Sequence, residues 1–100
     1  MVAAQGLNGI SIYDIKSGKL KQTLPINDDL VSSIDLNKGR LIVGLKSGKY
    51  NVWKTNGNKF EPVKIAVIGF DQPITAVKIH DSTAIIASYG RMYEVHLKDK

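Results

Sequence analysis

The sequence repeats itself with a period of 40 to 43 residues, and this repeat limits the folds that the chain can adopt. A shift of 43 residues aligns apolar positions of one predicted strand: Val31 with Ile74, Ile34 with Val77 and Leu36 with Ile79. The same shift aligns Ile42 with Ile85, Val43 with Ile86, Gly44 with Ala87 and Trp53 with His96. A shift of 40 relates an earlier copy: Val2 with Ile42, Ala4 with Gly44, Tyr13 with Trp53 and Leu20 with Phe60. A period in this range is typical of four-stranded units that pack side by side.

Short runs of β-branched and alternating residues follow one another along the whole chain, separated by tight-turn residues. Pairs such as Ser17-Gly18, Ser47-Gly48 and Asn56-Gly57 mark the turns. The expected strands span residues 2–5, 10–15, 20–24, 31–36, 41–45, 50–54, 60–68, 74–79, 83–88 and 92–97. No stretch has the apolar spacing of an amphipathic helix. The sequence therefore predicts an all-β, antiparallel fold.

Two positions of the repeat hold residues of one kind. Small residues share a position in the second strand of each copy: Ala4, Gly44 and Ala87. Flat side chains share a position late in the third strand: Tyr13, Trp53 and His96. We expect the small residues where strands crowd together, and the flat ones in the wedge between neighbouring sheets.

Three segments carry a resemblance to a known repeat. Residues 69–78 (Gly-Phe-Asp-Gln-Pro-Ile-Thr-Ala-Val-Lys) resemble the start of a WD repeat, and residues 47–54 resemble its third strand. Residues 8–14 are a shorter version that ends in Tyr13-Asp14, close to the Trp-Asp pair of the family. Phe70 replaces the usual histidine, so the buried His-Asp-Ser-Trp network of strong WD repeats is not available. The resemblance implies antiparallel four-stranded blades of a WD-repeat-like β-propeller.

The order of the expected strands indicates an incomplete ring. With blade strands labelled a to d outward from the axis, residues 2–24 supply b, c and d. Residues 31–68 supply a full blade, and residues 74–97 supply a, b and c. Ten strands cannot close a propeller of four or more blades. We expect the remaining blades to come from the same or another chain, and we favour a segment of a longer propeller over a short self-assembling protein.

The composition of the chain excludes cysteine chemistry and indicates the cellular compartment. The sequence has no cysteine and a formal net charge of +5, so no disulfide or thiolate metal site is possible. Residues 1–5 do not resemble a signal peptide. The apolar run at residues 65–70 is too short for a transmembrane segment. These features predict an intracellular protein, cytoplasmic or nuclear.

No group of residues has the pattern of a catalytic site. His80-Asp81-Ser82 contains the residue types of a hydrolase triad, but adjacent residues in a turn point in different directions. His80 and His96 are too isolated to predict a metal site. We therefore expect a protein that is not an enzyme and uses no cofactor.

The resemblance sorts the loops onto two faces. The d–a and b–c loops share the top face, which carries the candidate partner-binding residues Asp28, Asp29, Lys46, Phe70, Asp71, Gln72, Tyr89 and Arg91. Aromatic and arginine side chains on loops are typical of interaction hot spots. Membership of the WD-repeat class implies multi-protein assemblies. The leading hypothesis is therefore a scaffold or adaptor that binds other proteins, as a subunit of a larger complex.

The a–b and c–d loops share the bottom face, and that face is basic. Its candidate residues for an anionic partner are Lys16, Lys19, Lys38, Arg40, Lys54 and Lys59. Such a face attracts phosphates through a salt-dependent electrostatic term. The alternative hypothesis is therefore a phosphate-rich partner: RNA, DNA or anionic lipid. No aromatic residues are interleaved with these lysines, as single-strand binding requires, so we rank nucleic acid below protein.

Overall fold

The described part of the chain forms three antiparallel sheets and no helix. The computed structural model describes residues 2–6, 9–26, 29–56, 59–67 and 72–97. The first sheet contains β1 (Val2–Gln5), β2 (Gly9–Tyr13) and β3 (Leu20–Pro25). The central sheet contains β4 (Val31–Asn37), β5 (Arg40–Leu45), β6 (Lys49–Asn56) and β7 (Lys59–Val67). The third sheet contains β8 (Ala76–His80), β9 (Thr83–Ser88) and β10 (Arg91–His96).

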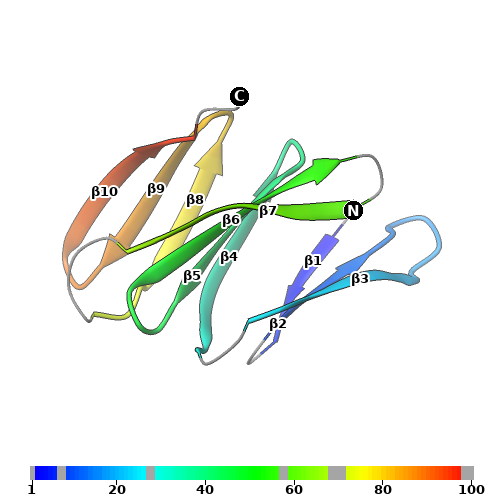
Figure 1. The fold of residues 1–100 in the computed structure, drawn as a ribbon, viewed down its shortest axis with the longest axis horizontal. Coiled ribbons are helices and arrows are strands. Elements are labelled where there is room, and N and C mark those ends of the chain that lie inside the picture. Colours follow the sequence, from blue (N-terminus) through cyan, green and yellow to red (C-terminus); the bar gives the residue numbers. More distant parts are fainter. Residues whose placement is uncertain (1, 7–8, 27–28, 57–58, 68–71, 98–100) are drawn as a thin grey trace.

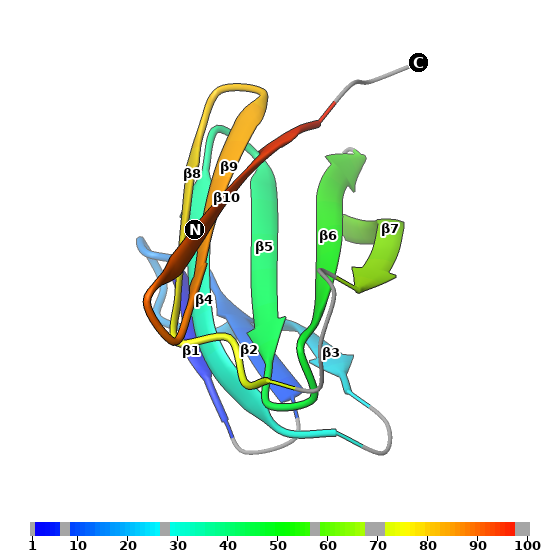
Figure 2. The same cartoon turned by 90° about the vertical axis from the view of Figure 1, so that its left-hand side faces the viewer.

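The sheets stand side by side in an unclosed row, and along one side β4 lies between β1 and β8 (Figure 1). Turned by 90°, the same view shows β7 on the opposite side of the row from β4 (Figure 2). The all-β prediction and the grouping of three, four and three strands are confirmed.

Tight hairpins set the register inside each sheet. The β9–β10 turn places Tyr89 (φ 40°) and Gly90 (φ 79°) between the paired Ser88 and Arg91. Two successive residues with positive φ form the turn whose twist matches that of the flanking strands. The β4–β5 turn uses Lys38 (φ 48°) and Gly39 (φ 78°) in the same way.

Turns of unequal length change which residues share a repeat position. Gly44 pairs with Tyr50, whereas the equivalent Ala87 pairs with Met92, because the second turn is one residue shorter. Trp53 therefore corresponds to Val95, which is half-buried against the central sheet, and His96 is exposed. The predicted equivalence of Trp53 with His96 was wrong, since a slip of one residue moves a side chain to the other face.

The same effect corrects three equivalences in the first sheet. Gln5, not Ala4, lies opposite Ile10 as Gly44 lies opposite Tyr50, because the β1–β2 loop is one residue shorter than the β5–β6 loop. By the same register Val2 corresponds to Leu41 and not to Ile42. Leu20 pairs with Tyr13, whereas Pro62 pairs with Trp53, so Leu20 corresponds to Pro62 and not to Phe60. The number of residues that separates equivalent positions in neighbouring sheets therefore differs from strand to strand.

Two hydrophobic clusters hold the row together. One joins the first and central sheets and contains Ile10, Ile12, Leu24, Ile26, Val31, Leu41, Val43, Leu45 and Phe60, with Trp53 packed against it. The other joins the central and third sheets and contains Ile42, Tyr50, Val52, Ile74, Val77, Ile79, Ala84, Ile86 and Leu97. Strand β5 contributes to both clusters, which explains its unbroken apolar run at residues 41–43. Each fully buried leucine or isoleucine contributes about 1.5–3 kcal/mol.

A single carboxylate also links the central sheet to the third. Asp35 Oδ2 on β4 accepts the backbone N–H of Ile79 on β8 at 2.7 Å. Ile79 is only 1% exposed, so its N–H has little access to water. A buried donor without a partner costs about 1–3 kcal/mol.

We therefore expect Asp35→Ala to lower the free energy of unfolding by about 1–3 kcal/mol. Asp35→Asn keeps a side-chain oxygen and should recover most of that loss. Urea unfolding of both variants tests this prediction. An Asp35→Ala variant as stable as the parent chain would show that this hydrogen bond does not hold the two sheets.

Candidate binding site

The described members of the predicted top face lie at one end of the strands, the lower edge of Figure 1. Asp29 accepts hydrogen bonds from the hydroxyl of Ser47 and from the N–H of Leu30. The N–H of Lys46 donates to the carbonyl of Leu30 at 2.9 Å. These bonds join the loop after β3 to the β5–β6 turn and bring Asp29 and Lys46 together. The carboxylate of Asp29 is used in hydrogen bonds between these two loops.

The aromatic part of this face is Tyr89, which is 65% exposed in the β9–β10 turn, with exposed Arg91 next to it. Gln72 is exposed in the loop before β8. Asp28, Phe70 and Asp71 lie outside the described residues. Within the described part, the face therefore has two separate components, the Asp29–Lys46 loops and the Tyr89–Arg91 turn.

The predicted basic residues lie at the opposite strand ends, but they do not form one site. Lys16 and Lys19 lie in the β2–β3 loop, and Lys54 and Lys59 flank the β6–β7 turn. Lys38 and Arg40 contact the third sheet: Lys38 Nζ lies 2.7 Å from Asp81 Oδ1, and Arg40 Nη1 donates to the Asp81 carbonyl at 2.8 Å.

The Lys38–Asp81 ion pair changes the titration of the carboxylate. The hydrogen bond from Lys38 and its positive charge lower the pKa of Asp81, and His80 and Arg40 add to this effect. Both side chains are more than half exposed, so the pair stabilises the fold weakly. Lys38 and Asp81 occupy equivalent turn positions, since the β4–β5 and β8–β9 strands are related by 43 residues.

A lowered folded-state pKa makes the contribution of Asp81 pH-dependent. That contribution is present above the ordinary aspartate pKa of about 3.9 and is lost as the pH falls through the lower folded value. We expect the parent chain to melt at a slightly higher temperature than Asp81→Asn at about pH 6, with the two converging as the pH falls through the lowered folded-state pKa of Asp81. Melting curves at low salt test this, and a constant difference at every pH would contradict it.

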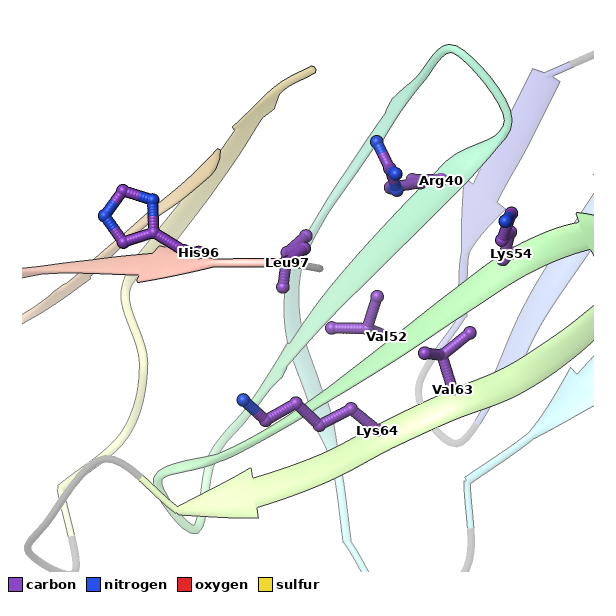
Figure 3. Close-up of a pocket in the computed structure, with 7 residues that line it drawn as sticks. All are labelled: Arg40, Val52, Lys54, Val63, Lys64, His96 and Leu97. Atoms are coloured by element: carbon purple, nitrogen blue, oxygen red, sulfur yellow. The ribbon is translucent and has the colours of Figure 1, made fainter. Parts of the chain in front are cut away.

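A pocket of about 270 Å³ opens between the central and third sheets. Its lining residues are Arg40, Val52, Lys54, Val63, Lys64, His96 and Leu97, and we call it the β10 pocket. Figure 3 shows Val52 on β6 and Val63 on β7 facing the space next to Leu97, at the end of β10. The His96 ring points away from the two valines. Among these lining residues no side chain is acidic, so the pocket combines an apolar base with a positive rim.

Sequence reasoning found only part of this pocket. Arg40 and Lys54 were predicted as members of a basic face, whereas Lys64, on β7, was not considered. Lys64 Nζ lies 5.9 Å from the centre of the Tyr50 ring, within reach of a cation–π contact. The sequence contained one indication of this pocket. The third copy of the repeat has no predicted strand equivalent to residues 60–68, so no predicted strand occupies the corresponding place beside residues 92–97.

A second pocket, of about 330 Å³, lies between β3 and the central sheet. Asn51 and Trp53 are among its lining residues, and both contribute a buried polar atom without a hydrogen-bond partner, Asn51 Oδ1 and Trp53 Nε1. The described residues contain no group of three or more His, Cys, Asp or Glu side chains arranged to hold a metal ion. No helix in the described part of the chain is long and apolar enough to cross a membrane.

Both ends of the row present a sheet face that no described residue covers. On the first sheet this outer face includes Tyr13 and Leu20, which are 37% and 55% exposed. On the third sheet it includes Met92, which is 74% exposed, next to Glu94. In the central sheet, Tyr50 and Val52, which correspond to Met92 and Glu94, are buried, and Trp53, which corresponds to Tyr13, is half-buried. Pro62, which corresponds to Leu20, is exposed.

The sequence matches no protein-family model and no curated protein. The fold is similar to those of two computationally designed proteins. The chain aligns with the designed Ika4 protein at a TM-score of 0.72 and 13% identity, over 96% of this chain and 64% of Ika4. It aligns with the designed Ika8 protein at a TM-score of 0.69 and 13% identity, over 95% of this chain and 32% of Ika8. This chain therefore spans less than two thirds of either protein, and at this identity the likeness concerns the fold alone.

Proposed function

We propose that the chain is a protein-interaction scaffold built from β-propeller-like blades of the WD-repeat type, acting in a multi-protein assembly. The observation that carries the proposal is the unclosed row, with an uncovered sheet face at each end. Repeat units depend on their neighbours to bury apolar surface. Further blades, from the same or another chain, would cover Tyr13 at one end and Met92 at the other.

The loops at the lower edge supply a surface for other proteins. Tyr89 and Arg91 are of the residue types enriched in interaction hot spots, and they lie in and directly after the two-residue turn between β9 and β10. A rigid aromatic anchor loses little conformational entropy on binding. The Tyr89–Arg91 turn is therefore the part of this face that we assign to partner binding.

Affinity capture from cell extract, in parallel with and without nuclease treatment, tests the proposal. The bait is the full chain, compared with a Tyr89→Ser, Arg91→Ser variant and with a Lys16→Ser, Lys19→Ser variant altered at the opposite strand ends. We expect a discrete set of proteins that persists at high salt, is lost with the first variant and is kept with the second. Recovery of nucleic acid alone, lost with the second variant and at high salt, would contradict the scaffold proposal.

One observation favours the alternative, a phosphate-rich partner. Arg40, Lys54 and Lys64 all line the β10 pocket, where no lining residue is acidic. The remaining predicted basic residues are dispersed over the β2–β3 and β6–β7 loops, and Lys38 is paired with Asp81. We rank this alternative second because phosphate binding along a backbone requires a continuous positive track.

A further inference from the structure

The third strand of the third sheet has an unpaired edge, unlike its equivalents. In the first and central sheets the corresponding strands, β2 and β6, are covered by β3 and β7. No strand of the described chain pairs with the outer edge of β10. The sequence of β10 also lacks proline and lysine, two of the residues that commonly protect such an edge, and its charged side chains are Arg91 and Glu94.

The hairpin geometry identifies the backbone groups at this edge. Ser88 and Arg91 flank a two-residue turn and are therefore a hydrogen-bonded pair. Bonded pairs alternate along an antiparallel ladder, so Arg91, Tyr93 and Val95 bond to β9. The N–H of Leu97 continues this series, donating to the carbonyl of Ser82 at 2.6 Å. The backbone groups of Met92, Glu94 and His96 therefore point outward.

The β10 pocket is the repeat equivalent of the place that Phe60 occupies between the first two sheets. Phe60, on β7, is 3% exposed and pairs with Thr55 on β6. Its backbone N–H and carbonyl bond to the side-chain amide of Gln22, at 2.8 and 3.0 Å. Ile12 belongs to the same cluster.

The strand registers show which residues of the third and central sheets are equivalent to these neighbours of Phe60, and those residues line the β10 pocket. Ile12 pairs with Gln22 as Val52 pairs with Lys64, so Gln22 corresponds to Lys64. Thr55 corresponds to Leu97, two positions beyond the equivalent Trp53 and Val95. Val52, Lys64 and Leu97 all line the β10 pocket. A side chain equivalent to Phe60, from a strand added to β10, would enter this pocket.

We propose that the edge of β10 and its pocket bind an extended acidic segment of a partner protein, which adds a fourth strand to the third sheet. An aromatic side chain of that segment fills the space over Val52, Val63 and Leu97. Its carboxylates lie near Arg40, Lys54 and Lys64, and Lys64, in the place of Gln22, can only donate hydrogen bonds. This inference rests on the scaffold function and names the chemistry of one partner.

The test uses the full chain and a fluorescent peptide of about eight residues, a typical strand length, alternating glutamate with large apolar residues around one phenylalanine. We expect saturable binding by anisotropy, with amide shifts at Met92, Glu94 and His96. N-methylation of the peptide residues that face β10 should weaken binding about tenfold, because it removes paired donors, and N-methylation of the alternate residues should change it little. Lys64→Glu should weaken binding about fivefold or more, whereas Lys78→Glu, on the uncovered face of the third sheet, should not.

Three outcomes would overturn the proposal: no saturable binding, equal losses from both N-methylation patterns, or equal losses from both lysine variants. Tighter binding of a short oligonucleotide than of the peptide, lost with Lys64→Glu, would also overturn it and assign the pocket to phosphate. The capture experiment depends on Tyr89 and Arg91, so a failed peptide test beside a successful capture would remove the strand site and leave the scaffold function standing.

Discussion

Phe60→Ala is expected to lower the free energy of unfolding by about 3–5 kcal/mol, the usual cost of removing a buried phenylalanine side chain. Phe60 is 3% exposed and belongs to the cluster that joins the first and central sheets. It is the part of β7 that reaches the first sheet, so its loss opens a cavity between the sheets. Since small domains have about 5–15 kcal/mol of stability, the variant should be close to unfolding in mild denaturant.

Urea unfolding followed by circular dichroism measures this loss. Val63→Ala is the matched control, because Val63 lies on the same strand and is half-exposed. Its effect should stay within about 0.5 kcal/mol. Similar losses for the two variants would mean that β7 does not pack against the first sheet through Phe60.

Gly44→Ala is expected to lower stability by about 3 kcal/mol, at the upper end for overpacking. A Cβ at Gly44 would lie 2.5 Å from Ile74 Cγ2, 3.1 Å from Ile74 Cβ and 3.1 Å from Ser33 Oγ. Ile74 is fully buried, and its N–H bonds to the carbonyl of Leu45, which leaves it little freedom to retreat. Ala87 has a Cβ at the equivalent position, where no further sheet of the described chain packs over it.

A double-mutant cycle separates this clash from a loss of backbone flexibility. Ile74→Ala alone should cost about 2–5 kcal/mol through the cavity that it leaves. In the double variant the 2.5 Å contact with Ile74 Cγ2 is gone and only the 3.1 Å contacts with the Cβ of residue 74 and with Ser33 Oγ remain, so the combined loss should be smaller than the sum of the two single losses. Strict additivity would show that Gly44 is required for a reason other than its contact with Ile74.

The strands could be predicted from the sequence because the turns are explicit. Pairs such as Ser17-Gly18 and Ser47-Gly48 separate the apolar runs, and the spacing of the turns gave three, four and three strands. Register was harder, because it depends on loop length as well as on the apolar pattern. A turn shorter by one residue moved His96 out of the wedge and put Val95 there.

The candidate pocket could not be predicted from local patterns. Its residues come from β5, β6, β7 and β10, and they converge only when the central and third sheets pack together. Lys64 is on a strand, where the sorting of loops by face did not apply. The three strands that the described chain gives to the third sheet were predicted from the sequence. The place next to β10 that corresponds to Phe60 is identified by the contacts of Phe60 and Gln22, which only the structure provides.

Residue-resolved amide hydrogen exchange of the chain tests the central claim, an unclosed row of three sheets with an open edge at β10. The structure predicts slow exchange at Ile79, whose N–H bonds to Asp35, and at Phe60, whose N–H bonds to Gln22. Along β10, Tyr93 and Val95 should exchange slowly, and Met92, Glu94 and His96 should exchange quickly. Uniform protection along β10, or fast exchange at both Ile79 and Phe60, would contradict the account.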